Sequence, residues 1–175
     1  MRKLKNSELE RISVENFKSS NKTPIVVVLD NVRSALNVGS AFRTSDAFRI
    51  EKVYLCGITC SPPNKEIRKS AIGATESVDW EKIDKTEDLV LQLRNEGYTI
   101  CSVEQVENST MLHQFSVPDK PIAVVFGNEV NGVQQSVIDN SHYCIEIPQI
   151  GTKHSLNISV SIGVVLWDLY NKITG

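Results

Sequence analysis

Five short apolar runs, rich in β-branched residues, recur along the chain and limit its fold more than any other feature. The run from Ile25 to Leu29 contains no polar residue. The others lie at 53–56, 98–101, 122–126 and 143–147. Helical patterns occur at 38–48, 87–93, 133–140 and 155–173, and Thr86 is predicted to cap the second of them. Strands without a polar face are typical of sheets that helices cover on both sides. We therefore predict an α/β fold with a mainly parallel sheet and helices on both faces.

The length of the chain fits one domain. A chain of 175 residues can bury a core of its own, and no internal repeat or low-complexity segment divides it. We predict a single domain over 1–175, with an arm at 1–22 and a body at 24–173. No apolar run approaches the roughly 18 residues of a membrane span, and the charged start leads into no apolar signal segment. We expect a cytoplasmic protein without a membrane partner.

Charge is divided unevenly between the arm and the body. The net charge of −2 argues against a protein that coats nucleic acid without specificity. Residues 1–22 hold six Lys or Arg and three Glu, so the arm carries +3 and the remainder −5. Ser7 and Glu10 have the spacing of a capping box, which predicts a short helix with Leu9, Ile12 and Phe17 as apolar contacts. Such an arm is either a nucleic-acid contact or a solvated helix face.

The cysteines predict no special chemistry. Cys56, Cys60, Cys101 and Cys144 are scattered, with no Cys-x-x-Cys pair and no histidine at zinc-binding spacing. Three of them lie inside apolar runs, where a buried, reduced thiol is the simplest interpretation. We therefore expect no metal site.

The last helical pattern, at 155–173, is apolar on almost every side. A helix without a polar stripe is buried all round. In a chain of this size a second subunit can supply one of the covering surfaces, and Ser159, Ser161 and Gly163 would permit its close approach. A central core helix and a helix at a subunit interface both remain open.

Three polar segments that contain glycine follow or adjoin predicted strands. Ligands of parallel sheets bind at the carboxyl ends of strands, so these segments are candidate sites by position. In segment 30–44, Asn37 is predicted to cap a helix from which Arg43 projects, an arrangement that suits a phosphate or an oxyanion. In segment 126–132, Gly127 and Gly132 bracket Glu129, and a tight turn there lets a ligand approach the backbone.

The third segment, 147–159, leads into the apolar helix. Ser155 is predicted as its N-cap, and Asn157 in its first turn needs a buried hydrogen-bond partner that a functional site could supply. Each segment alone is equally compatible with a plain strand-to-helix connection. The chain contains neither GxGxxG after its first strand nor GxxxxGK[ST], which disfavours dinucleotide-binding and P-loop proteins.

Together, and in this order, the three segments resemble the motifs of the SpoU (TrmH-like) branch of the SPOUT methyltransferases. Motif 1 corresponds to 31–43, with Asn37-x-Gly39-x-x-x-Arg43 at its centre. Motif 2 corresponds to Phe126-Gly127-Asn128-Glu129 through Gly132. Motif 3 corresponds to Ile147-Pro148 followed by Ser155-Leu156-Asn157-x-Ser159. The resemblance covers residues 24–170, nearly the whole chain.

The resemblance implies an α/β domain with a deep C-terminal trefoil knot, which works as a homodimer packed partly through the last helix. It implies S-adenosylmethionine as methyl donor, without a metal, and a ribose 2′-hydroxyl of RNA as acceptor. The donor-binding residues that it implies are Val103, Glu104, Gly127, Asn128, Ile147, Pro148 and Leu156. The catalytic residues that it implies are Arg43, Asn37, Glu129, Ser155 and Asn157.

Chemistry narrows the role of the arginine. A ribose oxygen must be aligned with the methyl group and stabilised as it becomes anionic. A guanidinium stays protonated in proteins, so we expect Arg43 to stabilise that charge and bind phosphate rather than act as a base.

Transfer RNA is the expected substrate; the alternatives are ribosomal RNA and a knotted RNA-binding module without activity. Phosphate contacts are expected from Arg33, Arg43, Lys65, Arg68 and Lys69.

Overall fold

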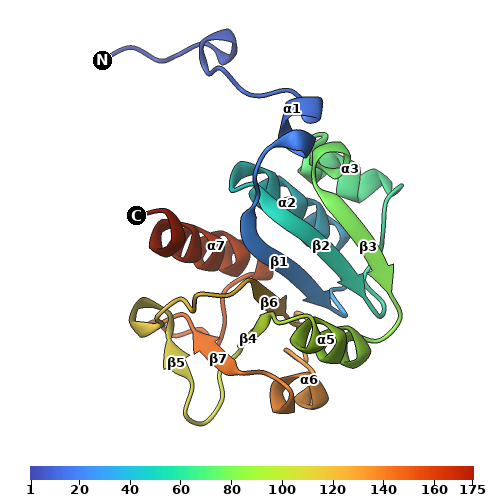
Figure 1. The fold of residues 1–175 in the computed structure, drawn as a ribbon, viewed down its shortest axis with the longest axis vertical. Helices are drawn as coiled ribbons and strands as arrows, with labels where there is room; N and C mark the ends of the chain where they lie inside the picture. Colours follow the sequence, from blue (N-terminus) through green and yellow to red (C-terminus); the bar gives the residue numbers. More distant parts are fainter.

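The structure is a computed structural model that describes all of residues 1–175. Its centre is a seven-stranded sheet in the order β3-β2-β1-β6-β4-β7-β5 (Figure 1). Every neighbouring pair of strands is parallel, which confirms the predicted fold class. The strands are β1 Thr23–Asp30, β2 Ile50–Cys56, β3 Asp79–Ile83, β4 Thr99–Val103, β5 Thr110–Met111, β6 Ile122–Phe126 and β7 Tyr143–Glu146.

Helices pack on both faces of this sheet. They are α1 Val14–Ser19, α2 Ala35–Ala47, α3 Lys65–Ala71, α4 Ala74–Ser77, α5 Thr86–Asn95, α6 Gln135–Asp139 and α7 Ile158–Thr174, with 3₁₀ turns η1 Asn6–Glu8 and η2 Leu112–Gln114. Successive residues of a strand point to opposite faces. Val27 and Leu29 of β1 accordingly join the core under α2 and α7, whereas Val26 and Val28 join the core under α5 and α6.

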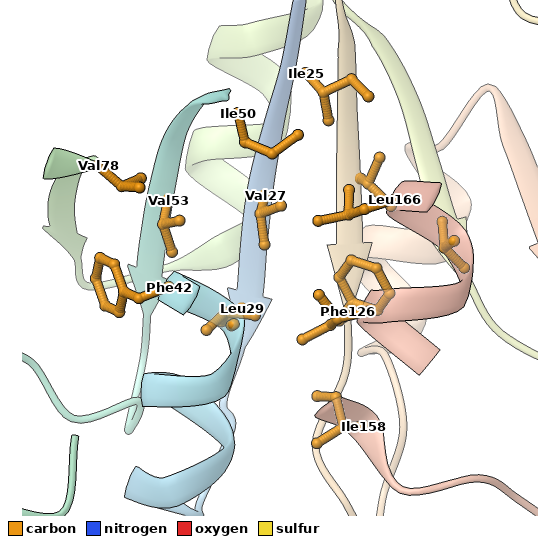
Figure 2. Close-up of a cluster of buried hydrophobic side chains, with 14 of the residues drawn as sticks. Ile25, Val27, Leu29, Phe42, Ile50, Val53, Val78, Phe126, Ile158 and Leu166 are labelled. Atoms are coloured by element: carbon orange, nitrogen blue, oxygen red, sulfur yellow. The ribbon is translucent and has the colours of Figure 1, made fainter. Parts of the chain in front are cut away.

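The larger core forms where α2 and α7 meet the sheet. Figure 2 shows Phe42 of α2 beside Val53, and Leu166 and Ile158 of α7 on the side of Phe126. All of these side chains are fully or almost fully buried. The continuous apolar run of β1 is therefore explained, because helices cover it from both sides.

Two strands carry too little apolar sequence to be recognised in advance. β3 lies at one edge of the sheet, and most of its side chains are exposed or half-buried. β5 is only two residues long and lies at the other edge. Edge strands are often short or charged, a pattern that protects the sheet from further pairing.

The N-terminal arm differs from its predicted form. The carboxylate of Glu8, not Glu10, accepts a hydrogen bond from a capping backbone N–H, that of Lys5 at 2.6 Å. The helix α1 begins later, where Ser13 Oγ accepts from Asn16 N at 3.2 Å. Only Phe17 is buried among the expected apolar contacts. The beginning of the arm extends away from the body (Figure 1). The Ser7 capping box was therefore a wrong prediction.

Three predicted helix caps were also wrong. Ser34, three residues before Asn37, caps α2. The hydroxyl of Thr86 donates to a buried carboxyl group, so Thr86 does not cap α5. Asn157 itself is the N-cap of α7 and accepts from Ser159 N at 2.8 Å, which leaves Ser155 in the preceding loop. Asn157 is exposed and needs no buried partner.

The buried thiols expected inside the apolar runs are found at Cys56 and Cys101, whereas Cys144 is only half-buried. All four thiols are free, with Cys56 and Cys101 buried and Cys60 and Cys144 half-buried. Burial raises the pKa of Cys56 and of Cys101 to about 12, so both thiols stay protonated. No group of three or more His, Cys, Asp or Glu side chains is arranged to hold a metal ion. No helix has both the length and the apolar character that a bilayer crossing requires.

The helix α7 is not covered on all sides within one chain. Ile162, Val165 and Leu166 face the core, whereas Val160 and Trp167 are 51% and 54% exposed. Trp167 stacks against Tyr170 and contacts Phe48 beside α2. A single chain therefore leaves an apolar strip on α7 in contact with water. The trefoil knot stays a prediction of the resemblance.

Candidate functional site

A cavity of about 540 Å³ lies at the carboxyl ends of β4, β6 and β7. Its wall is formed by the ends of these three strands and the segments that follow them, and the segment after β7 leads into α7. Ligands of parallel sheets bind at this edge. The volume lies within the range of about 300–1,000 Å³ that small-molecule sites occupy.

Most of the predicted site residues line this cavity. They are Val103, Glu104, Gly127, Asn128, Glu129, Ile147, Ser155, Leu156 and Asn157. Pro148 does not, although its neighbour Gln149 does. The sequence reasoning missed other lining residues, among them Gln105, Gly132, Glu146 and His154. Of these, Gly132 and His154 stood in segments that the sequence singled out, whereas Gln105 and Glu146 did not.

Glu129 joins motif 1 to motif 2. Its carboxylate accepts three hydrogen bonds: from Arg33 N at 2.8 Å, from Ser34 N at 3.0 Å and from Asn37 Nδ2 at 2.9 Å. The donors include backbone N–H groups at the start of α2, where a negative charge is favoured. Asn37 therefore reaches the cavity wall through Glu129, and the two predicted catalytic residues lie in contact.

These donors also set the acidity of Glu129. Partial burial acts to raise the pKa of its carboxyl group, but the hydrogen bonds from Arg33, Asn37 and Ser34 outweigh burial and lower it below 4.5. The pKa of Glu129 is lower in the folded than in the unfolded state. The ionised carboxylate therefore stabilises the folded state at pH values above the ordinary pKa of a glutamate. That contribution disappears as the pH falls through the folded value.

We therefore expect Glu129→Gln to flatten the acid side of the stability curve. The wild-type protein should lose more unfolding free energy than the variant as the pH falls from neutrality to below about 4.5. Urea denaturation at a series of pH values measures this difference. Glu107→Gln, at an exposed carboxylate without a hydrogen bond, is the matched control and should follow the wild type. Equal slopes for wild type and Glu129→Gln would contradict the prediction.

The turn after β6 is closed by its own backbone. Asn128 and Gly132 exchange two backbone hydrogen bonds of 2.9 Å, and Asn128 Nδ2 donates to Asn31 O at 2.7 Å. A Cβ at Gly127 would overlap the backbone of Gly132 and Val133. Glycine is thus required at 127 because the turn folds back on it.

Glu104 and Gln105 connect the other segments of the wall. Glu104 Oε2 accepts from Val133 N at 3.0 Å, which ties the end of β4 to the turn after β6. Gln105 Nε2 donates to His154 O at 3.1 Å, which ties β4 to the segment before α7. The cavity is therefore held by side chains of its own wall.

Asp30, at the end of β1, connects several segments near the site through hydrogen bonds to its carboxyl group. Its side chain is fully buried. Its carboxyl oxygens accept from Asn31 Nδ2 at 2.9 Å, from Thr86 Oγ1 at 2.5 Å, and from the backbone and side-chain nitrogens of Gln134 at 2.9 and 2.7 Å. The start of α5, the turn before α6 and motif 1 therefore meet at one carboxyl group.

Arg43 does not join the other predicted catalytic residues. It follows Asn37 by six residues, or about 9 Å along the helix axis, and its exposed side chain lines a separate hollow beside the N-terminal arm. Arg33, Lys65, Arg68 and Lys69, predicted to contact phosphate, are exposed. Lys69 pairs with Glu66 at 2.8 Å. One chain therefore brings together Asn37, Glu129, Ser155 and Asn157 but leaves Arg43 apart.

Comparison with known proteins identifies the family. The model of the SpoU rRNA Methylase family matches residues 24–167. The chain belongs to this family. An uncharacterized tRNA/rRNA methyltransferase of Borreliella burgdorferi is 26% identical to this SpoU-family chain over 160 residues, which are 91% of the chain and 69% of the relative. The 23S rRNA (guanosine-2′-O-)-methyltransferase RlmB of Neisseria meningitidis is 29% identical over 143 residues, or 82% and 56%.

Solved structures share the SpoU fold. The TrmH/SpoU tRNA modifying enzyme of A. aeolicus superposes with a TM-score of 0.80 at 26% identity, covering 91% of this chain and 79% of that one. An AdoMet-bound rRNA methyltransferase from Sinorhizobium meliloti has a TM-score of 0.82 at 24% identity, covering 89% and 59%. The SpoU-family chain described here spans 63% of the length of two relatives from Staphylococcus.

Proposed function

We propose that the chain transfers a methyl group from S-adenosylmethionine to a ribose 2′-hydroxyl of RNA. The observation that carries this proposal is the cavity at the ends of β4, β6 and β7, where Glu129, Ser155 and Asn157 line one wall. Two relatives support the acceptor atom, because RlmB of Neisseria meningitidis and TARBP1 of mouse are named as guanosine-2′-O-methyltransferases of 23S rRNA and of tRNA, respectively.

The cavity suits a donor of this kind. Its wall carries the carboxylates of Glu104, Glu129 and Glu146 and no lysine or arginine, so it favours a ligand with positive charge. S-adenosylmethionine supplies an electrophilic methyl group on a positively charged sulfur. The residues of the wall hold the donor and exclude water from its methyl group. Leu156 and Ile147 supply apolar surface for it.

The acceptor must be aligned and then stabilised as its oxygen becomes anionic. Asn37 is positioned by Glu129, and Ser155 and Asn157 lie at the exposed entrance to α7. Their hydroxyl and amide groups orient the ribose. Arg43 supplies positive charge, which stabilises the alkoxide without removing the proton itself. The proton leaves to water or to a phosphate oxygen of the RNA.

A second subunit resolves the separation of Arg43 from the cavity. We propose a homodimer in which the exposed strip of α7, with Val160, Val164 and Trp167, is buried against its symmetry mate. Arg43 lies on the exposed side of α2, which packs beside α7. The arginine of one subunit then serves the cavity of the other.

Transfer RNA is the proposed substrate. The body of this chain carries net negative charge, so phosphate contacts must come from local basic groups. The exposed residues Arg33, Lys65, Arg68 and the arm provide them. Two copies in a dimer would present a footprint that suits a compact folded RNA recognised through its backbone.

One assay tests the activity, the acceptor atom and the RNA together. The protein is incubated with methyl-tritiated S-adenosylmethionine and separated transfer and ribosomal RNA, and the RNA is digested to nucleosides. We expect label in a 2′-O-methylnucleoside from transfer RNA. Label from ribosomal RNA alone would assign the other substrate, and label on a base would overturn the proposed acceptor. Donor binding without transfer to either RNA would identify a binding module.

A further inference from the structure

Backbone strain is concentrated in one place on this molecule. Five residues other than glycine have a positive φ, and two of them are Asn31 and Asn108, a residue type that tolerates this conformation. The other three are Glu10 at 46°, Arg49 at 50° and Ile72 at 50°. All three line the hollow that contains Arg43. Strained residues persist where the surrounding structure holds them, and they cluster at binding and catalytic sites.

The hollow is distinct from the donor cavity. Its volume is about 780 Å³, and it lies between the end of the arm, the last turn of α2 and the turn from α3 to α4. The residues beside it precede β2, so it lies toward the amino ends of β1 and β2. The donor cavity lies at the opposite ends of the strands. No residue lines both spaces.

Ile72 is the most informative of the strained residues. It ends α3 in the left-handed conformation, where glycine is the usual residue and a β-branched side chain is an outlier. Its side chain is 67% exposed, so packing within the chain does not account for it. Its apolar side chain is therefore available for contact with a partner outside this chain.

The charges of the hollow indicate the partner. Arg11, Arg43 and Arg49 line it, and none of their guanidinium groups forms an ion pair or a hydrogen bond. Carboxylates of Glu10, Asp46 and Glu76 line it too, and Asp46 accepts from Ser77 Oγ at 2.5 Å. This mixture does not suit a simple anion. It suits a nucleotide, which combines an anionic phosphate with N–H donors on the edge of its base and an apolar face.

We propose that this hollow binds one unstacked nucleotide of the RNA substrate. Arg11 and Arg49 contact its phosphate, and Ile72 packs against the face of its base. The strain at Ile72 is retained because a glycine, which fits the backbone better, would lose this contact. The inference rests on the proposed function, since it assigns the RNA substrate a second point of attachment beside Arg43.

The deciding variant is Ile72→Gly in the full-length chain. Relief of the left-handed strain should raise the Tm by about 2 °C. Loss of the apolar contact should weaken transfer RNA binding about fivefold, measured by fluorescence anisotropy. Calorimetric titration with S-adenosylhomocysteine should give unchanged affinity. A higher Tm with unchanged RNA affinity would overturn the proposal.

Arg49→Gln gives a second, independent readout. It should weaken RNA binding and reduce the slope of log affinity against log salt by about one. Lys120→Gln removes one exposed positive charge outside the hollow and should leave that slope unchanged. If Ile72→Gly instead dissociates a dimer in sedimentation, the contact belongs to a second copy and the proposal fails. If the wild-type protein transfers no methyl group but Ile72→Gly and Arg49→Gln still weaken RNA binding, the proposed function fails while the nucleotide site stands.

Discussion

Arg43→Ala should lower the rate of methyl transfer by a factor of at least about one hundred. A group that stabilises developing charge in a site shielded from water contributes on the order of 3 kcal/mol to the transition state. Donor binding should stay close to wild type, because Arg43 is proposed to act on the acceptor oxygen of the RNA and not on the donor. Single-turnover methylation of transfer RNA measures the rate, and calorimetry measures the donor affinity. A near-normal rate would remove Arg43 from the reaction.

Mixing subunits tests where this arginine acts. If Arg43 serves the cavity of the other subunit, an inactive Arg43→Ala protein and an inactive Asn157→Ala protein should complement each other. Half of the randomly mixed dimers would carry both kinds of subunit, and one of the two sites in each would be intact. Co-expression should therefore restore about a quarter of the wild-type activity. No recovery would place Arg43 and Asn157 in the same site of one chain.

Asp30→Ala should destabilise the fold by about 3 kcal/mol or more, without touching the cavity directly. The side chain is fully buried, and its removal leaves the donors of Asn31, Thr86 and Gln134 without an acceptor. Urea denaturation at neutral pH measures the loss as a lower midpoint. The donor site should weaken as a secondary effect, because the motif 1 loop loses an anchor.

The control for this prediction is a surface carboxylate. Asp139 is exposed and accepts only from Gln135 Nε2 at 2.7 Å on its own helix. Asp139→Ala should change the unfolding free energy by less than about 0.5 kcal/mol, as is usual for surface positions. A loss for Asp30→Ala no larger than that of Asp139→Ala would show that the buried hydrogen bonds contribute little.

The interior of the fold was predictable from sequence, whereas its edges and helix ends were not. Residues 25–29 are apolar on both faces, and only a central strand buries both faces. Asp79–Ile83 forms a strand through pairing with β2 at the edge of the sheet, and its polar sequence carries no signal of that pairing. Helix caps depend on single hydrogen bonds. Thr86 had the right chemistry for a cap but found a stronger partner 56 residues earlier.

Many of the residues that line the cavity were predicted from sequence, but the contacts among them were not. The resemblance to the SpoU motifs selected Asn37, Glu129 and Asn157, because each segment alone is equally compatible with a plain strand-to-helix connection. The hydrogen bonds that hold the wall join residues far apart in sequence, such as Gln105 and His154, and no local pattern encodes them. Spacing along a helix also gives no information on which hollow Arg43 would line. Its separation from Glu129 required the three-dimensional structure.

The order of the strands has a consequence for how this protein is made. β1 pairs with β2 on one side and with β6 on the other, and β6 begins 92 residues after β1 ends. At a ribosomal rate of about 5–20 residues per second, one edge of the apolar strand β1 waits roughly 5–18 s for its neighbour. An unpaired apolar edge of this kind is a template for aggregation. The nascent chain should therefore depend on a chaperone, or on early cover by α2, until β6 leaves the ribosome.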